Sequence, residues 1–521
     1  MRKLILLTLL GLLGSLSFID TGSAGWRRRR SYCPLPSYGT AAPQVIAPQD
    51  GTKPGPKNLY VRYESRSPEG QKMLKIYARA VGIMKATSAT DPDSWTFQWY
   101  THAVRDDKTK MDELMAIFGP GSRPNKTLAQ SMWDTCQPHM PPAIEDDFLP
   151  WHRMYVYYFE EIIRAVSGVK EFTLPYWNYS AAGPTHGVIP PEFTKKTDPL
   201  FGSLYIDNRN KGVNMGQAID KGQPPGTLNT DVLAECFYQP SDGVHEGFCM
   251  RLDGGLHGRV HVLVGDPKNM GSVPWAANDP IFWLHHCNID RLWASWNKAG
   301  RKNPPGSGSY TFAEDKQSVV AKVPDWMVPE TEAHGYSYDQ LESVPDCPIT
   351  KDDLTRRLKN QRRIAAVKTK GIKLLPTPTT VKLDPLKVDD GGKPTPFPQR
   401  VKALPKDKRL SLIVKNLQAD LPPGVLYQLY LELPEGAKGD KRTPHLVGTI
   451  NFFDAVRHGD AHAKKPKKGP DRFFQFDITN LARTLHARNL LTATPTLTIA
   501  PAGAPAEKAN PVIGEILVVE H

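Results

Sequence analysis

Two adjacent histidines, His285 and His286, lie inside an apolar and aromatic stretch that reads DPIFWLHHCNIDRLW. Upstream, the segment GGLHGRVHVLVG places His257 and His261 four residues apart. On a helix this spacing puts both imidazoles on one face, where they can converge on one point. Such a pair is a weak signal alone, so its meaning depends on the other histidines.

Three more histidines occur in similarly apolar surroundings: His102 in FQWYTHAV, His139 in CQPHM and His152 in FLPWHRMYVYYFE. A buried polar ring without a partner is costly. Few carboxylates accompany these rings, which indicates a metal bound by nitrogen ligands. All-imidazole sites suit zinc, copper, iron or nickel. If the adjacent pair His285 and His286 contributes one ligand, six imidazoles remain, three from each half of one helical region, and they favour two metal ions.

The composition is that of a globular protein with more than one domain. The chain has 521 residues, 40% hydrophobic and 23% charged, and 48 prolines. This length exceeds one ordinary core, so we expect two or three domains. The net charge of +12 comes largely from segments that resemble tails and linkers, so we expect no nucleic-acid partner.

The N-terminus has the pattern of an export signal. Arg2 and Lys3 precede an apolar run too short for an ordinary membrane span, and small residues follow it. We therefore predict a signal peptide over residues 1–24, a secreted or periplasmic location, and no membrane association after its removal. Residues 25–57 are predicted to be an irregular, basic and proline-rich lead-in.

The periodicity of the chain changes along its length. Helical patterns dominate from residue 58, including LPWHRMYVYYFEEIIRAV and a helix that Asn278 or Asp279 would cap. We predict a mainly α catalytic domain over 58–345 and a basic, proline-rich linker over 346–409. Short alternating runs such as RLSLIVKNL and GEILVVEH then predict an all-β sandwich over 410–521.

The motifs FLPWHRMYVYYFE, HGRVH and NDPIFWLHHCNIDRLW resemble the central domain of tyrosinases and polyphenol oxidases. The resemblance implies a four-helix core that binds two copper ions and oxidises phenols and catechols to o-quinones with dioxygen. It implies the following ligands: His102, His139 and His152 for the first copper, and His257, His261 and His286 for the second.

The same resemblance assigns supporting residues. His285 and Asn288 would stand behind the ligands, because the family uses the second histidine of the HH pair. Adjacent helical residues point about 100° apart, which agrees with a single ligand from this pair. The stretch between His139 and His152 is longer than the corresponding stretch in most family members. His139 therefore matches the family pattern less closely than the other five ligands do. Cys136 and His139 match a thioether pair of many members, with a free or disulfide-bonded Cys136 as the alternative.

Two pocket positions bear on the substrate. Gly258 follows His257, where members with strong monophenol hydroxylation often have Asn, which helps a Glu hold a water that deprotonates the phenol. Gly258 has no side chain for this, and Glu246 is the nearest upstream carboxylate. Val273 falls where the family has a small residue at the pocket entrance. The resemblance thus implies small phenolic substrates, with catechols preferred, and a true tyrosinase as the alternative.

The β-type tail resembles the family's C-terminal domain, which covers the copper site with a placeholder side chain. Within YLELPEGAKGDKRTPHLVGTINFF we expect this side chain to be Leu433. The chain would then be latent, with the basic linker as a plausible activation site. Tyr336 and Tyr338 of HGYSYDQ would pack near Arg62.

Two other classes of protein could also have histidine-rich metal sites. A dicopper oxygen carrier has similar sites, but forms very large assemblies and needs no covering domain. A zinc hydrolase would want a carboxylate base or bridge, which these motifs lack. Of six cysteines, Cys236 and Cys249 are the best candidate disulfide pair, because they flank a loop-like stretch.

Overall fold

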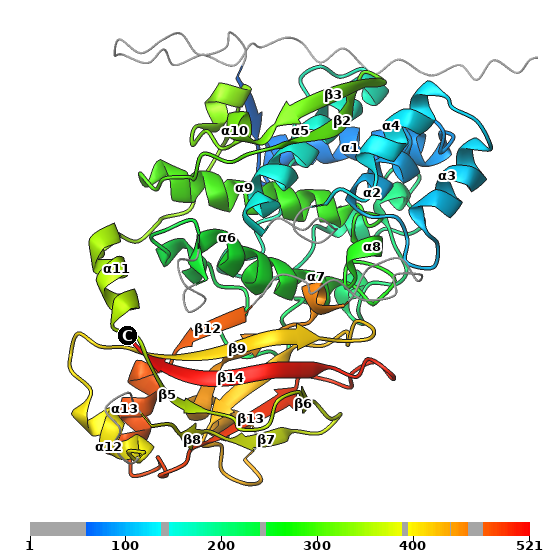
Figure 1. Cartoon of the computed structure of the whole chain (residues 1–521). Coiled ribbons are helices and arrows are strands. Elements are labelled where there is room, and N and C mark those ends of the chain that lie inside the picture. Colours follow the sequence, from blue (N-terminus) through cyan, green and yellow to red (C-terminus); the bar gives the residue numbers. More distant parts are fainter. Residues whose placement is uncertain (1–58, 137–144, 240–245, 388–393, 438, 457–472) are drawn as a thin grey trace, which may run out of the picture. The chain divides into compact units, whose positions relative to one another are not determined.

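The computed structural model describes residues 59–521 except 137–144, 240–245, 388–393, 438 and 457–472 (Figure 1). The predicted signal peptide and lead-in therefore lie outside the described residues. The described part has one large hydrophobic core among helices and a second core between β-sheets. Among the described helices, none is long and apolar enough to cross a membrane.

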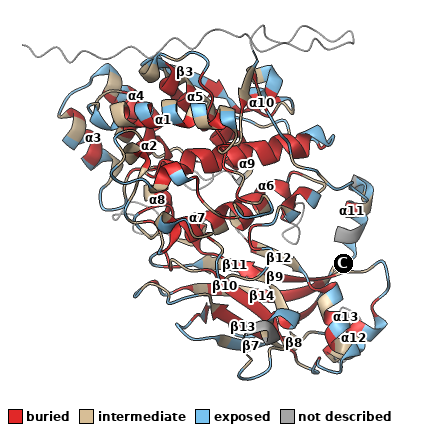
Figure 2. Cartoon of the chain, turned by 180° about the vertical axis from the view of Figure 1, so that it is seen from behind, coloured by how far each residue is buried: buried red, intermediate tan, exposed pale blue. Residues whose placement is uncertain are grey.

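The predicted mainly α region is confirmed, and two long helices form its centre. Helix α5 packs against α9 and α1, and α9 is buried from its first residue almost to its last (Figure 2). Aromatic rings join α5 to α9: Phe159 stacks on Trp283 with ring centroids 3.4 Å apart. The helices are α1 (Pro68–Ala86), α2 (Trp95–His102), α3 (Lys110–Phe118), α4 (Pro124–Met132), α5 (Phe148–Ser167), α6 (Gly247–Arg251), α7 (Gly258–Val264), α8 (Val273–Ala276), α9 (Ile281–Lys298) and α10 (Val323–Trp326).

Polar side chains fix where the important helices begin. The hydroxyl of Ser94 accepts a hydrogen bond from the Phe97 amide and so caps α2. Asp279, one of the two predicted caps of α9, accepts a hydrogen bond from the Ile281 amide at 3.1 Å. Its carboxylate also pairs with the buried guanidinium of Arg209 at 2.7 Å. The start of α9 is therefore anchored to a distant loop.

A buried ion-pair network closes the helical region. Strand β1 (Tyr60–Arg62) pairs in parallel with β4 (Tyr336–Tyr338). Arg62 makes ion pairs with Glu160 on α5 and Asp290 on α9, and lies 3.8 Å from the centroid of the Tyr336 ring. Tyr338 donates to Asp290 at 2.6 Å. The predicted packing of both tyrosines near Arg62 is confirmed. Breaking such a buried pair typically costs about 3–5 kcal/mol.

The C-terminal region is the predicted β-structure, built as two sheets around one core. One sheet has the order β11-β10-β13-β7, and the other has β12-β9-β14-β5-β8, with β6 also on β14. Figure 1 shows β9 and β14 side by side as long strands. The strands are β5 (Arg362–Ala366), β6 (Ile372–Lys373), β7 (Thr379–Lys382), β8 (Asp384–Pro385), β9 (Leu410–Gln418), β10 (Tyr427–Leu431), β11 (Leu446–Ile450), β12 (Phe473–Asp477), β13 (Thr496–Pro501) and β14 (Val512–Glu520).

The predicted linker over 346–409 differs from what the structure contains. Strands β5 to β8 fall inside it and pair with β13, β14 or each other, and α11 (Lys351–Lys359) and α12 (Phe397–Ala403) flank them. Strands at the edge of a sheet often carry Lys and Pro, which discourage pairing with another chain. The segment includes the edge strands β7 and β8 as well as the internal strand β5, so its basic, proline-rich composition did not indicate a linker.

The predicted pairing of Cys236 with Cys249 was wrong. Cys236 forms its disulfide with Cys347, 111 residues away, and Cys249 is buried in α6. Proximity in sequence is a poor guide here because the chain returns to Cys236 only after the whole helical region is complete. In a chain-entropy account, closing a loop of about 100 residues contributes roughly 4.7 kcal/mol.

Candidate metal centre

Two groups of buried side chains have the geometry of metal sites. We call His102, Cys136 and His152 the first cluster, and His257, His261, His285 and His286 the second cluster. Within each cluster the potential ligand atoms lie within 4.8 Å of one another. Helices α2, α5, α7 and α9 or their ends supply the histidines, so the clusters depend on the packing of the helical core. His139 lies outside the described residues.

The two clusters adjoin each other. The rings of His152 and His286 are stacked, with centroids 4.2 Å apart and an angle of 8° between their planes. His257 also lies close to both, at 6.1 Å from His152 and 5.1 Å from His286. Two metal ions held by these clusters would therefore be neighbours.

Backbone carbonyls hold four of the imidazoles by Nδ1. His102 is 3.0 Å from the Val273 carbonyl, His152 is 2.7 Å from the Phe148 carbonyl, His257 is 3.0 Å from the Asp253 carbonyl, and His261 is 2.8 Å from the Met270 carbonyl. A carbonyl accepts only if Nδ1 carries the proton. This contact thus fixes the tautomer whose Nε2 lone pair can bind a metal.

Burial favours the neutral form of three imidazoles in the second cluster. Burial, followed by neighbouring imidazoles, holds the pKa values of His261, His285 and His286 well below the ordinary value. Neutral imidazole is the form that binds metals. Nε2 of His261 and both ring nitrogens of His286 are buried without a hydrogen-bond partner among the described residues. Buried polar atoms rarely lack partners, so these nitrogens fit metal ligands.

The structure places both histidines of the HH pair at the second cluster. His285 and His286 each contribute a ring nitrogen to the second cluster, and both side chains are fully buried. His286 stacks on His152 of the first cluster, whereas His285 lies parallel to His257 at 5.3 Å. His286 is thus the residue of the pair that faces both clusters. The assignment of His286 as ligand remains a prediction.

A carboxylate that the sequence analysis passed over lies beside the second cluster. Asp253 is buried, and its Oδ1 is 3.1 Å from Nδ1 of His257. The signal for it was present, because Asp253 precedes His257 by four residues and a helical turn brings the two together. Glu246, the carboxylate expected from the sequence, lies elsewhere.

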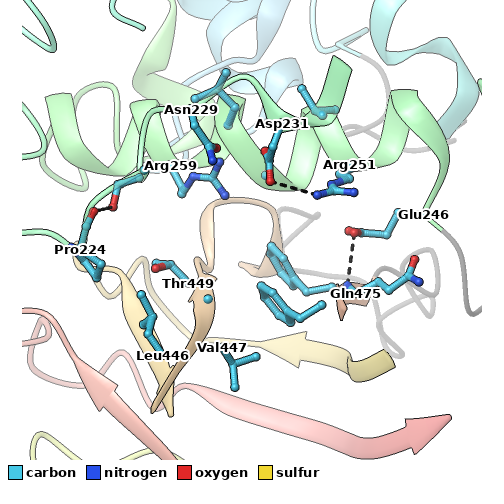
Figure 3. A pocket seen from close by; sticks show the side chains of 18 of the residues that line it. Pro224, Asn229, Asp231, Glu246, Arg251, Arg259, Leu446, Val447, Thr449 and Gln475 are labelled. Carbon is cyan, nitrogen blue, oxygen red and sulfur yellow. Dashed lines mark hydrogen bonds and ion pairs between the residues drawn. The ribbon is translucent and has the colours of Figure 1, made fainter. Parts of the chain in front are cut away.

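Glu246 lines a cavity of about 230 Å³ between residues 224–232, residues 246–259 and strands β11 and β12 (Figure 3). It accepts a hydrogen bond from the Gln475 amide at 3.2 Å. Burial raises the pKa of Glu246 to about 8, against the opposing effect of Arg251. This carboxyl group therefore belongs to the contact with β12.

The remaining predicted positions surround the clusters. Gly258 is buried and starts α7 directly after His257. Val273 is fully buried, and its carbonyl is the one that holds His102. Asn288 is buried in α9 and accepts a hydrogen bond from Arg291 at 2.9 Å, one turn from His285. Cys136 lies 3.5 Å from Nε2 of His152.

Aromatic rings of the helical core contact the second cluster, such as Phe282 at 4.2 Å from His286, and one further ring comes from the C-terminal region. Phe453, in the 3₁₀ turn η9 (Phe453–Ala455), stacks on His261 with centroids 4.2 Å apart and an angle of 16°. It also meets His257 edge-on at 5.6 Å. Leu433, the residue expected here, follows β10 and is only partly buried. Phe453 is the last residue of the segment YLELPEGAKGDKRTPHLVGTINFF, within which Leu433 was expected to be the placeholder.

Comparison with known proteins identifies the family. A profile of the common central domain of tyrosinase matches residues 92–240 and 229–299. The chain is 34% identical over 314 residues to tyrosinase HcTyr1 of Hahella sp., covering 54% of this chain and 63% of that protein. It is 32% identical over 198 residues to the tyrosinase of Streptomyces glaucescens, covering 33% of this chain and 68% of that one.

Among solved structures, latent apple tyrosinase matches with a TM-score of 0.56 and 19% identity, covering 90% of this chain and 99% of the other. That likeness extends over both the helical and the β-rich regions and concerns the fold. The chain spans a little under two thirds of the Hahella tyrosinase. With the sequence identities above, the chain belongs to the tyrosinase family, whose members have dicopper centres.

Proposed function

We propose that this chain is a dicopper oxidase that converts o-diphenols to o-quinones with dioxygen. The gathering of backbone-tethered imidazoles into two adjoining clusters carries the proposal. One copper would take His102, His139 and His152, and the other His257, His261 and His286. When bound, the copper pair supplies dioxygen binding and the transfer of electrons from the phenol. Two catechols give up four protons and four electrons to one dioxygen, which leaves as two waters.

The protein groups orient the partners of this reaction. The Nδ1 contacts keep the rings of His257 and His261 fixed, so little reorganisation is needed during turnover. The face of His261 accepts a flat aromatic ring, as its stacking with Phe453 illustrates. A phenol bound there would lie against the second cluster, away from bulk water.

We further propose that catechols are preferred to monophenols. A monophenol must lose its proton before its ring is hydroxylated, and a positioned general base contributes about 10²–10⁴-fold to such a step. Gly258 cannot hold a water through a side chain. Asp253 Oδ1 lies 3.1 Å from Nδ1 of His257, and Glu246 accepts a hydrogen bond from the backbone amide of Gln475.

The chain as described would be latent, because Phe453 lies where the substrate ring would bind. Activation then requires that this side chain move away. Residues 346–409 contain paired strands, so a cut there would act by loosening the β-region. The disulfide between Cys236 and Cys347 would keep the start of this segment attached to the helical region.

Two smaller proposals concern processing. Residues 1–24 would direct export, and Cys136 would form a thioether with His139. The cross-link removes two hydrogens, which dioxygen would accept, so a peptide containing both residues would be lighter by that mass. Cys136 lies 3.5 Å from Nε2 of His152, so it adjoins the first cluster, to which His139 is assigned.

The test of the proposed function is oxygen consumption by the copper-loaded chain, before and after limited proteolysis. Catechol and phenol with the same ring substituent form the matched substrate pair. We expect slow catechol oxidation that proteolysis accelerates, and a monophenol rate that stays far lower, with a lag. Equal rates on both substrates, or copper loading without any oxidation after proteolysis, would refute the proposal.

A further inference from the structure

Gly258 lacks a side chain at a position where the backbone does not require glycine. Its φ and ψ are −62° and −34°, which are helical values open to any residue. The missing side chain instead makes room. A Cβ atom on Gly258 would lie 2.7 Å from Oδ1 and 2.9 Å from Nδ2 of Asn451, closer than real Cβ contacts. Asn451 therefore fills the space that a side chain at 258 would need.

Asn451 is fixed in this space at both ends of its amide. Nδ2 donates to the Gly254 carbonyl at 2.7 Å, and Oδ1 accepts from the Phe453 amide at 3.1 Å. The Gly254 carbonyl belongs to the π-helical turn Leu252–His257, in which Gly255 departs from helical φ and ψ. Asn451 is 3% exposed, so it cannot swing into solvent without losing both hydrogen bonds.

The contact between Gly258 and Asn451 is linked to the second cluster through Phe453, two residues after Asn451. Phe453 follows Asn451 closely, and its amide is held by the Asn451 side chain. The same residue places its ring 4.2 Å from that of His261. Displacing the Asn451 amide thus removes the support that orients Phe453 on the imidazole.

We propose that Gly258 is the docking position for Asn451, and that any side chain at 258 excludes the closed arrangement of Phe453 on His261. One position then controls both access to the histidines and the group next to the substrate. The inference rests on the proposed function and concerns the regulation of the same site.

The test is a double-mutant cycle in the full-length chain, using Gly258→Ala, Asn451→Gly and the double variant. Alanine improves on glycine in a helix by about 1 kcal/mol, so α7 should still form. The matched control is Gly82→Ala on α1, where the added Cβ meets Ser203 at an ordinary 3.7 Å. Additivity fails where two residues touch, which is what the cycle measures.

The first readout is hydrogen exchange of residues 446–456 in copper-loaded and metal-free chain, because the Phe453 amide is bonded to Asn451. Gly258→Ala should raise the exchange rate of this segment at least about tenfold, a change of roughly 1.4 kcal/mol. In the Asn451→Gly background the same substitution should add little. The control should match wild type.

The second readout is catechol oxidation, which should rise with exchange across the same variants. Unchanged exchange in Gly258→Ala, or an equal effect in both backgrounds, overturns the docking of Asn451 on Gly258. Coupled exchange in a chain that never oxidises catechol leaves the docking intact and refutes the proposed function instead. The two failures are therefore distinguishable.

Discussion

The first and second clusters are built alike but differ in their surroundings. The first is enclosed by helical-core aromatics: His102 lies 5.0 Å from Phe282 and 6.0 Å from Trp151. The second also contacts helical-core aromatics, with Phe282 at 4.2 Å from His286, but it additionally contacts Phe453, which the C-terminal region supplies. Carbonyls of the helical region hold His102 and His152 of the first cluster and His257 and His261 of the second, so these four rings do not depend on the β-region for their orientation. The difference teaches that ligand placement and substrate access are separate properties of this fold.

The largest expected effect separates the two members of the HH pair. His286→Ala should lose one copper and catechol oxidation by more than about 100-fold, since even residues behind metal ligands are worth 10–100-fold. His285→Ala should keep both coppers with lower thermal stability. The measurements are copper per chain and oxygen uptake after proteolysis. Loss of copper in His285→Ala with retention in His286→Ala would reverse the assignment.

Removing the ring over the second cluster should open the site without disturbing the metal. Phe453→Ala in the full-length chain should raise catechol oxidation on the order of tenfold, because an aromatic pair contributes about 0.5–1.5 kcal/mol beyond its burial. The matched control is Leu433→Ala, which alters a partly buried side chain after β10. Equal activation by both variants would mean general loosening of the β-region.

Gly258→Asn sharpens the distinction between access and chemistry. Like Gly258→Ala it should open the site, but only Asn adds an amide that can hold a water. We expect the ratio of monophenol to diphenol rates to rise on the order of tenfold in Gly258→Asn relative to Gly258→Ala. Rates are compared in proteolysed samples, so that access is equal. An identical ratio in the two variants would show that position 258 does not govern phenol deprotonation.

The burial of Glu246 beside β12 should become less favourable as pH rises, because the ionised carboxylate loses its hydration. Burial raises its pKa to about 8 in the folded chain, so the folded state holds more protons than the unfolded one between about pH 4.3 and 8. Stability should therefore fall with rising pH across that window and level off beyond it. Glu246→Gln should flatten this part of the thermal-midpoint profile by several degrees. Glu507→Gln, at an exposed position, serves as the control.

Much of the centre could be predicted from sequence because its information is local. Histidines four residues apart on a helix, or within long aromatic motifs, can be recognised as candidate ligands without knowledge of the rest of the chain. The short apolar runs of β9 and β14 are local in the same sense, whereas the N-cap of α9 is Pro280 and not the expected Asn278 or Asp279. Tyr336 and Tyr338 were placed near Arg62 through the family resemblance.

The features that sequence reasoning missed depend on contacts between distant segments. Cys236 meets Cys347 only because the chain returns to it, and the basic strand β5 is recognisable only by its pairing with β14. Phe453 was overlooked because the sequence around it contains several aromatic residues. Nothing in that sequence indicates which of them contacts His261. Asp253 was also missed, but it differs from these cases because its spacing of four residues from His257 is a local signal that could have identified it.

The most direct test of the central claim is metal analysis and oxygen uptake on one sample of copper-loaded Phe453→Ala protein. The account predicts two coppers per chain and two catechols consumed for each dioxygen. One metal ion per chain, or tightly held zinc that copper does not displace, with no catechol oxidation, would contradict it.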